Sequence, residues 1–450
     1  MMEASRSTPR CDMLGVPGLR LHSFMTDSSD DEKHFTQAVA ELGEKQDVVA
    51  ARTIFNIQGT KVLEKGVAIN LGLYERLMQH KLSAPLEDSV SSTSSVSPDS
   101  LKRSAEDVMR DIPFFGRMAA DDKARKILLN TIETVPLPDA MAFQLTVARD
   151  VRPEIYQHLI RTALTAAWLA RTPLISRYDL QMAAAGGLLH DIGMLHIDPL
   201  LLQPDHVLNR DQRRQLYSHP LLSVTLLDRH HQYSRDVVRA VGEHHECLDG
   251  SGYPRNLSGD AISPLGKILS LAQVVAAMFA PGRNAPEMRL SVLLRMNTHR
   301  YDNAMAMQVV GLLKPQLDVM SAEIRRLEDP MGVLRAIDRL LCQWPMDLGR
   351  QGDLVAARRE AVDLIARHAG QLRRALAGVG AVPDQLDQLG PEALDDTVLT
   401  ELTLLTREAS WQLRTMASQA RRRWQAQSGE TLPEPLGEWL DEVDTVVARA

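Results

Sequence analysis

Two short segments rich in metal-ligand residues constrain the fold of this chain more than any other feature. The first reads LLHDIGM at 188–194 and places His190 beside Asp191. The second reads HHECLDGSGYP at 244–254 and places His244 beside His245, ahead of two glycines and a proline. Imidazole nitrogens and a carboxylate that can bridge two cations are ligands that transition metals take from proteins. The sequence therefore predicts that the two segments meet at a compact site for more than one metal ion.

The composition favours a helical, soluble-type chain of two to four domains. Of 450 residues, 44% are hydrophobic and only 4% are aromatic, and methionine is plentiful. These proportions favour helix over strand. The formal net charge of −7 provides no broad basic field, which argues against nucleic acid as the main partner.

The cysteines and the apolar segments indicate the cellular compartment in which the protein is expected. Cys11, Cys247 and Cys342 are odd in number and far apart, so they predict no disulfide framework and a reducing compartment. No apolar run reaches the roughly 18 residues of a membrane span, and the N-terminus lacks the apolar core of a signal peptide. We therefore expect a cytoplasmic protein without a membrane span.

The pattern along the chain predicts five segments. Short strands around Gln58-Gly59 and a helix from Leu71 to Leu82 indicate a small mixed α/β unit, and a Ser- and Pro-rich stretch follows it. We expect a disordered segment over 1–45, a small α/β domain over 46–83, a flexible linker over 84–100, a helical domain over 101–285 and a helical region over 286–450.

Two helices of the central domain bear on the site. Met182 to Leu189 is apolar nearly all round, as in a helix buried within a bundle, and it ends at His190 and Asp191. Leu265 to Phe279 follows Pro264 and predicts a second apolar helix.

Three further residues are candidate ligands. Glu154 and His158 are four positions apart, which puts both on one helix face, although such pairs also decorate helix surfaces. His219 precedes Pro220, a pair that also starts ordinary helices and loops. A helix bundle can bring all the candidates to one centre. The predicted metal ligands are Glu154, His158, His190, Asp191, His219, His244 and His245.

On these residues, the chain resembles the HD-GYP family of bacterial metal-dependent phosphohydrolases over roughly residues 150–285. The second segment matches the family pattern HHExxDGxGYP at every defined position. The resemblance implies an HD-superfamily helical bundle that cleaves cyclic di-GMP with two or three ions, most often iron or manganese. It implies that Asp191 bridges metals as the catalytic carboxylate and that Glu154 completes a third metal site. It also implies substrate contacts by Gly252, Tyr253, Pro254 and Arg283.

Two positions depart from the family pattern. The family has HDxGK where this chain has Met194, so a lysine that binds substrate phosphate is missing. The family has an aspartate ligand in a D-x-x-D-A pattern, and Gln273 occupies its first acidic position. A lost charge-assisted contact typically costs about 1.5–3 kcal/mol.

Two functions stay open at this point, with a third disfavoured. The chain is either a metal-dependent phosphodiesterase in bacterial signalling or a degenerate nucleotide receptor or protein adaptor without turnover. A phosphohydrolase for another nucleotide is disfavoured by the complete GYP loop. Residues 286–450 could form a homodimer, dock a signalling protein or cover the site. The apolar stripe from Leu402 to Met416 favours intramolecular core.

Overall fold

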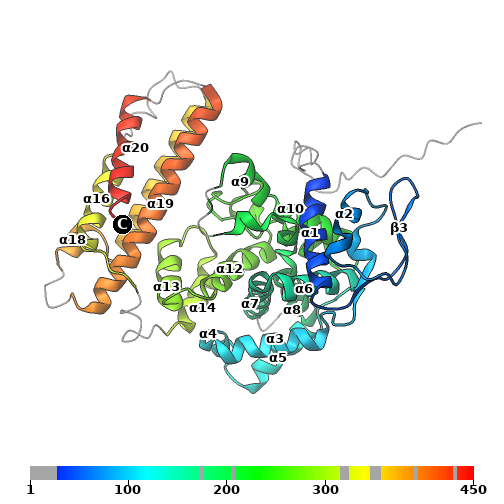
Figure 1. The fold of residues 1–450 in the computed structure, drawn as a ribbon. Coiled ribbons are helices and arrows are strands. Elements are labelled where there is room, and N and C mark those ends of the chain that lie inside the picture. Colours follow the sequence, from blue (N-terminus) through cyan, green and yellow to red (C-terminus); the bar gives the residue numbers. More distant parts are fainter. Residues whose placement is uncertain are drawn as a thin grey trace, which may run out of the picture.

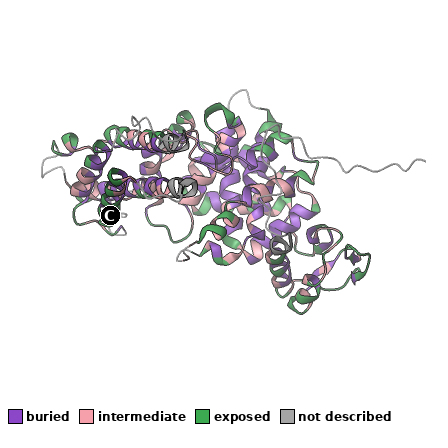
Figure 2. Cartoon of the chain, turned by 90° about the horizontal axis from the view of Figure 1, so that it is seen from above, coloured by how far each residue is buried: buried purple, intermediate pink, exposed green. Residues whose placement is uncertain are grey.

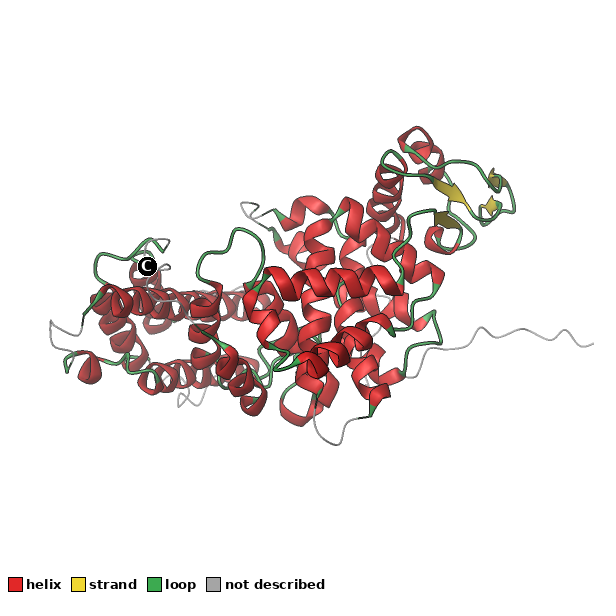
Figure 3. Cartoon of the chain, turned by 90° about the horizontal axis from the view of Figure 1, so that it is seen from below, coloured by secondary structure: helices red, strands yellow, loops and turns green. Residues whose placement is uncertain are grey.

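The computed structural model describes residues 28–171, 176–203, 206, 208–314, 324–344, 356–388, 394–428 and 433–450. These residues form three parts in chain order, with the N-terminal and C-terminal parts on opposite sides of a central helical domain (Figure 1). The protein is mainly helical, as its composition predicts. The strands drawn in Figure 3 all belong to the N-terminal part. No helix among the described residues is both long enough and apolar enough to cross a membrane.

The N-terminal part combines two helices with two small antiparallel sheets. One sheet pairs β1 with β4 in the register Val48↔Ser92, and the other pairs β2 with β3. The elements are α1 (Ser28–Gly43), β1 (Val48–Ala50), β2 (Ile54–Phe55), β3 (Lys61–Leu63), α2 (Leu71–Met78), the 3-10 helix η2 (Leu86–Asp88) and β4 (Val90–Ser92). The expected helix from Leu71 to Leu82 is shorter, because Leu82 instead forms a β-bridge with Asn56.

Two predictions for this part were wrong. The segment 1–45 was expected to be disordered, yet α1 packs its apolar stripe of Phe35, Val39 and Leu42 into the main core. Residues 1–27 of that segment lie outside the described residues. The segment 84–100 was expected to be a flexible linker, but Val90 and Val96 are buried and β4 completes a sheet. The few large apolar residues of this segment are all buried, although its serine-rich composition predicted a flexible linker.

The central domain is a bundle built around two closely packed helices, α7 and α8. Gly187 of α8 lies against the backbone of Thr162 and Ala163 of α7, where an added Cβ would come within 2.7 Å of the Ala163 Cα. The small residues at this point of both helices allow the contact, and most residues of the two helices are buried. Figure 2 shows buried residues gathered in the interior of the helical body. The helices of the domain are α3 (Pro98–Asp111), α4 (Pro113–Arg117), α5 (Asp122–Glu133), α6 (Asp139–Val151), α7 (Pro153–Ala170), α8 (Arg177–Leu189), η3 (Ile192–His196), η4 (Pro199–Leu202), α9 (Arg210–Leu216), α10 (His219–Asp228), α11 (Arg235–Val241), η5 (Gly259–Ala261), α12 (Pro264–Met278), α13 (Pro286–Met296) and α14 (Asn303–Leu312).

The C-terminal part is a separate set of helices with its own apolar core. Its elements are α16 (Pro330–Cys342), α17 (Ala356–Gly378), α18 (Pro383–Leu386), α19 (Asp396–Ser428) and α20 (Glu434–Val447). On α19, Leu405, Ala409, Leu413 and Met416 are buried in this core. The stripe that the sequence shows is therefore intramolecular core, as predicted.

Helix α13 joins the two cores. Leu290 and Leu294 on one of its faces belong to the central core, whereas Met288, Val292 and Met296 on the other belong to the C-terminal core. Residues of α14 also lie in the central core. The central domain thus extends past the expected end at residue 285, because the apolar side chains of α13 and α14 complete its packing.

Candidate metal centre

Six of the seven predicted ligands meet inside the central domain. His158 lies on α7, His219 is the first residue of α10, and the remaining four follow the C-terminal ends of α8 and α11. The potential ligand atoms form two groups whose members lie within 4.8 Å of one another. One group contains Asp191, His219, His244 and His245, and the other contains His158, His190 and Asp191. Asp191 belongs to both.

The two carboxylate oxygens of Asp191 face different histidines. Oδ1 lies 3.1 Å from Nε2 of His219 and 3.3 Å from Nε2 of His244. Oδ2 lies 3.3 Å from Nε2 of His190 and 3.6 Å from Nε2 of His158. This division is the arrangement required of a carboxylate that bridges two metal ions.

Backbone carbonyls fix the orientation of three of the imidazoles. Nδ1 of His190 lies 2.9 Å from the carbonyl oxygen of Gly187, and His219 and His244 make the same contact with the residue three positions earlier, at 2.7 and 2.6 Å. Each Nδ1 therefore carries a proton and donates it, which leaves the Nε2 lone pair directed into the centre. This outer hydrogen bond is typical of histidines that bind metal.

The chemistry of the donor set fits a cation. Nε2 atoms face one another at 3.2 Å between His158 and His190, 3.2 Å between His219 and His244, and 3.1 Å between His219 and His245. Lone pairs that converge in this way repel unless a positive charge lies between them. In addition, Asp191 Oδ1 is buried and accepts no hydrogen bond from the described residues. The centre can therefore hold a divalent metal ion.

Electrostatics keeps these residues in the protonation states that metal ligands need. Burial lowers the pKa of His158 to about 3 and that of His244 to about 4, and it lowers the pKa of His245 well below its ordinary value. Burial opposes ionisation of Asp191, but attraction to His190 and His219 outweighs it and holds the pKa of this carboxyl well below its ordinary value. These three histidines are therefore neutral and Asp191 is charged near pH 7.

The loop after the two histidines folds back onto them. The Tyr253 amide donates to the carbonyl oxygen of His245 at 3.1 Å, and the two rings stack with centroids 4.5 Å apart. Gly250 has a φ of +78°, in the left-handed region that favours glycine. An added Cβ on Gly252 would lie 2.4 Å from the His245 carbonyl oxygen. The glycines thus allow the tight turn that brings Tyr253 over the metal centre.

Two buried acids hold this loop, and neither role could be predicted from the sequence pattern. The Glu246 carboxylate accepts from the backbone amides of Arg255 and Leu257 at 2.7 and 2.9 Å. The Glu243 carboxylate accepts from the amide and hydroxyl of Ser263, at 2.8 and 2.6 Å, at the start of α12. An acid beside an HH pair could have suggested Glu246 only as a ligand.

The other predicted site residues lie outside the two ligand groups. Glu154 is exposed in the first turn of α7 and belongs to neither ligand group. The side chain of Met194 packs against the central core. Gln273 donates to the Ser270 carbonyl at 3.4 Å and also lies outside both groups. Pro254 follows Tyr253 through a cis peptide bond.

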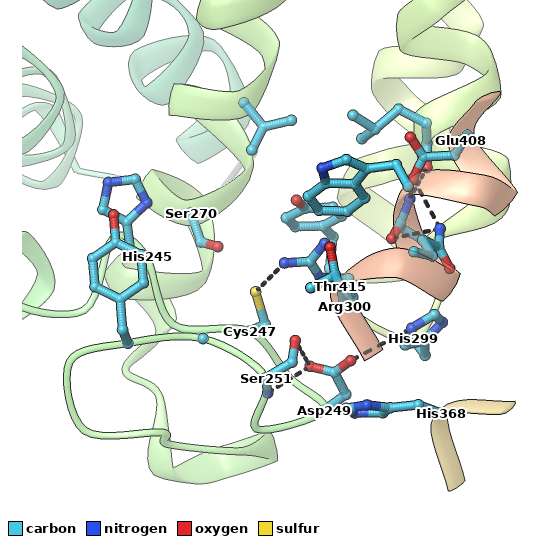
Figure 4. A pocket seen from close by; sticks show the side chains of 18 of the residues that line it. His245, Cys247, Asp249, Ser251, Ser270, His299, Arg300, His368, Glu408 and Thr415 are labelled. Carbon is cyan, nitrogen blue, oxygen red and sulfur yellow. Dashed lines mark hydrogen bonds and ion pairs between the residues drawn. The ribbon is translucent and has the colours of Figure 1, made fainter. Parts of the chain in front are cut away.

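A cavity of about 620 Å³ opens beside the centre, between the central domain and the C-terminal helices. His245, Gly252, Tyr253, Gln273 and Arg283 line it, so most of the predicted substrate-contact residues share one space. Figure 4 shows the loop on one side of the cavity and the C-terminal helices on the other. Tyr217, which belongs to no motif in the sequence, also lines the cavity and stacks on Tyr253 with centroids 4.3 Å apart.

Comparisons with known proteins agree with this site. Residues 143–305 match the family model described as "HD domain". The chain is 25% identical over 314 residues to 3'3'-cGAMP-specific phosphodiesterase 3 of Vibrio cholerae, covering 66% of each chain. It is 34% identical over 146 residues to 3'3'-cGAMP-specific phosphodiesterase 1 of the same organism, covering 32% of this chain and 33% of the relative. It is 32% identical over 172 residues to a probable cyclic di-GMP phosphodiesterase of V. cholerae, covering 34% of this chain and 38% of the relative.

The chain thus spans just under two thirds of the first relative and about a third of each of the other two. The matched region of the family model contains every residue of both ligand groups and the whole loop from His244 to Pro254. Residues 143–305 are thus similar to HD domains, and within them lies the complete HHExxDGxGYP tract on which the chain resembles the HD-GYP family.

Proposed function

We propose that this chain is a metal-dependent phosphodiesterase module that hydrolyses a cyclic dinucleotide, with cyclic di-GMP as the first candidate substrate. The observation that carries the proposal is that the two carboxylate oxygens of Asp191 face two different groups of histidines. The relatives named as phosphodiesterases of cyclic di-GMP and 3'3'-cGAMP support the same class of reaction.

The cofactor we propose is a pair of iron or manganese ions. Imidazole suits iron and carboxylate suits manganese, so the mixed donor set admits both. His219, His244 and His245 would hold one ion, His158 and His190 the other, and Asp191 would bridge them. We propose no third ion, since Glu154 lies in neither group. When bound, such a pair supplies an acidified water and charge stabilisation for in-line attack at phosphorus.

Residues of the cavity would bind and orient the substrate. Arg283 carries a positive charge on the cavity wall and suits a phosphate oxygen. Gly252 and Tyr253 would contact the nucleotide beside His245, while Pro254 shapes the loop behind them. Cytoplasmic location and a signalling partner or homodimer stay predictions from the sequence.

A receptor without turnover is the second candidate, and Met194 favours it. Its side chain packs on the core and presents no charge, so the family's lysine contact with phosphate has no replacement at this position. Gln273 likewise offers only a neutral oxygen. Such a protein would bind the nucleotide and release no product.

The deciding experiment is a hydrolysis assay on full-length protein purified without oxygen and loaded with iron or manganese. Cyclic di-GMP and 3'3'-cGAMP are each supplied, and metal content is measured on the same sample. Linear dinucleotide or mononucleotide product, absent with Asp191→Ala and retained with the exposed His231→Ala, establishes the enzyme. Nucleotide binding without product from a metal-loaded sample establishes the receptor instead.

A further inference from the structure

The cavity beside the metal centre has one wall that lies outside the HD domain. The family model ends at residue 305, whereas Glu408, Trp411 and Gln412 of α19 line the same cavity as His245 and Tyr253. A volume of about 620 Å³ is in the range of pockets that enclose small molecules. A ligand in this cavity would therefore touch the C-terminal part as well as the metal-site loop.

The position of this wall is fixed by α13, which contributes apolar side chains to both cores. Polar contacts reinforce it beside the cavity. Arg295 of α13 forms an ion pair with Glu401 of α19, and Asn297 donates to Glu408 Oε1 at 2.8 Å. Because the two parts share a helix, α19 is held in place before any ligand arrives.

Trp411 is an aromatic side chain left accessible inside this concave surface. Its ring is 51% exposed, whereas the buried stripe of the same helix, with Ala409 and Leu413, packs into the C-terminal core. The indole is thus not needed to fill the core. Flat aromatic faces of this kind bind nucleobases by stacking, at about 1–3 kcal/mol per base.

Glu408 offers a carboxylate next to this ring. Its Oε1 accepts from Asn297 and from Gln412, each at 2.8 Å, and in the part of the chain that the structure describes nothing donates to Oε2. The two amides hold the carboxylate without neutralising it. A carboxylate only accepts hydrogen bonds, so it suits the N1–H and N2–H edge of guanine and not the N1 acceptor of adenine.

Two arginines bring positive charge to the same cavity. Arg300 donates to the Cys247 sulfur at 3.3 Å, as Figure 4 shows, and its Nε is buried with no partner among the described residues. Arg283 also lines the cavity. One cavity thus combines positive charge with an aromatic side chain and a carboxylate, which suits the phosphate and base ends of one nucleotide.

We propose that α19 forms the base-binding wall of the substrate cavity, where Trp411 stacks on a purine and Glu408 selects guanine. This inference rests on the proposed function, because it names the part of the substrate that the C-terminal helices bind. It assigns to those helices a role in substrate choice that the HD domain alone does not contain.

The test measures binding separately from turnover. A phosphorothioate analogue of cyclic di-GMP, which resists hydrolysis, is titrated by calorimetry into full-length metal-loaded protein. Trp411→Ala should weaken binding by about tenfold or more, and Trp411→Phe should restore most of it. Tyr178→Ala is the matched control, since Tyr178 is similarly exposed at 56% and does not line the cavity. In hydrolysis assays, Trp411→Ala should raise KM and leave kcat nearly unchanged.

Glu408→Gln tests base selection. It should reduce the preference for the cyclic di-GMP analogue over the cyclic di-AMP analogue by several-fold, with thermal melting confirming an intact fold. If wild type binds and Trp411→Ala matches both wild type and Tyr178→Ala, the inference is wrong and the proposed function stands. If wild type neither binds nor hydrolyses a cyclic dinucleotide, the proposed function and this inference fail together.

Discussion

Tyr253 stacks on His245 with ring centroids 4.5 Å apart and an interplanar angle of 19°, which couples the glycine loop directly to one of the candidate metal ligands. His245 is the one histidine of its group for which no Nδ1 contact with a backbone carbonyl is among the hydrogen bonds of the described residues. Stacking on Tyr253 is therefore one of the ring contacts that orient it, beside those with His244 and His219. Tyr253 thus contacts the candidate metal centre as well as the cavity.

Loss of this stack should weaken metal binding. We expect Tyr253→Leu to lower metal affinity by about 10–100-fold, the usual effect of removing a residue that orients a ligand. Tyr253→Phe keeps the ring and should bind metal like wild type. Competition of each metal-loaded variant with a chelator measures the difference. Equal affinities of Tyr253→Leu and wild type would show that His245 is oriented by other contacts.

Asp191→Ala should remove both halves of the centre at once. The carboxylate belongs to both ligand groups, so neither can be completed without it. We expect elemental analysis to find less than a tenth of the wild-type metal content, with no measurable hydrolysis. His231→Ala, an exposed histidine outside the groups, should keep its metal. A variant lacking Asp191 that still bound two ions would contradict the bridging role.

The metal-free protein should lose stability in mild acid. Burial lowers the folded-state pKa of His158 to about 3 and of His244 to about 4, whereas both titrate near 6.5 when unfolded. Between these values the unfolded chain binds more protons, so the free energy of unfolding falls as the pH falls from about 6.5 toward 4. Each histidine should cost about 2 kcal/mol between pH 6.5 and pH 5.

Urea unfolding of the chelator-treated protein at several pH values measures this loss. His158→Gln should reduce the slope against pH, since one of the proton-binding sites is gone. A free energy of unfolding that stays constant between pH 6.5 and pH 5 would show that these imidazoles titrate in the metal-free folded protein as they do in the unfolded chain.

Gly252→Ala should distort the loop. The new Cβ would meet the His245 carbonyl oxygen at 2.4 Å and the Cys247 nitrogen at 2.5 Å, both of them backbone atoms that cannot move independently. We expect a loss of about 1–3 kcal/mol in the free energy of unfolding, with reduced metal content. Gly311→Ala in α14 provides the control, because its Cβ meets nothing within 4 Å. Thermal melting of the two variants compares them.

Restoring the two departures from the family pattern should raise turnover. Met194→Lys adds a cation for phosphate and Gln273→Asp adds an anionic oxygen on α12. The lysine stem can keep the apolar contact that Met194 makes while its head reaches solvent. We expect the double variant to increase kcat/KM for cyclic di-GMP by about tenfold or more. No gain in a folded, metal-loaded double variant would show that these positions do not limit activity.

The local chemistry of the centre could be predicted from the sequence, and the geometry could not. His158, His190, Asp191, His219 and the 244–245 pair were chosen for residue type and motif, and all lie in the two groups. Glu154 shares the helix face of His158 in the pattern, yet it is exposed and lies in neither ligand group. Helical spacing fixes a shared face but not how far along the helix the neighbouring elements reach.

The sequence by itself determined the helical class and the residue types that meet at the candidate centre, since both follow from side-chain chemistry and short-range backbone geometry. Only the tertiary structure decided which histidines face each oxygen of Asp191 and that α1 and β4 belong to packed units. It also decided that α19 closes the cavity with Trp411. An amphipathic stripe shows that a face will be buried, but the partner surface depends on helix crossings set by distant residues such as Gly187 and Ala163.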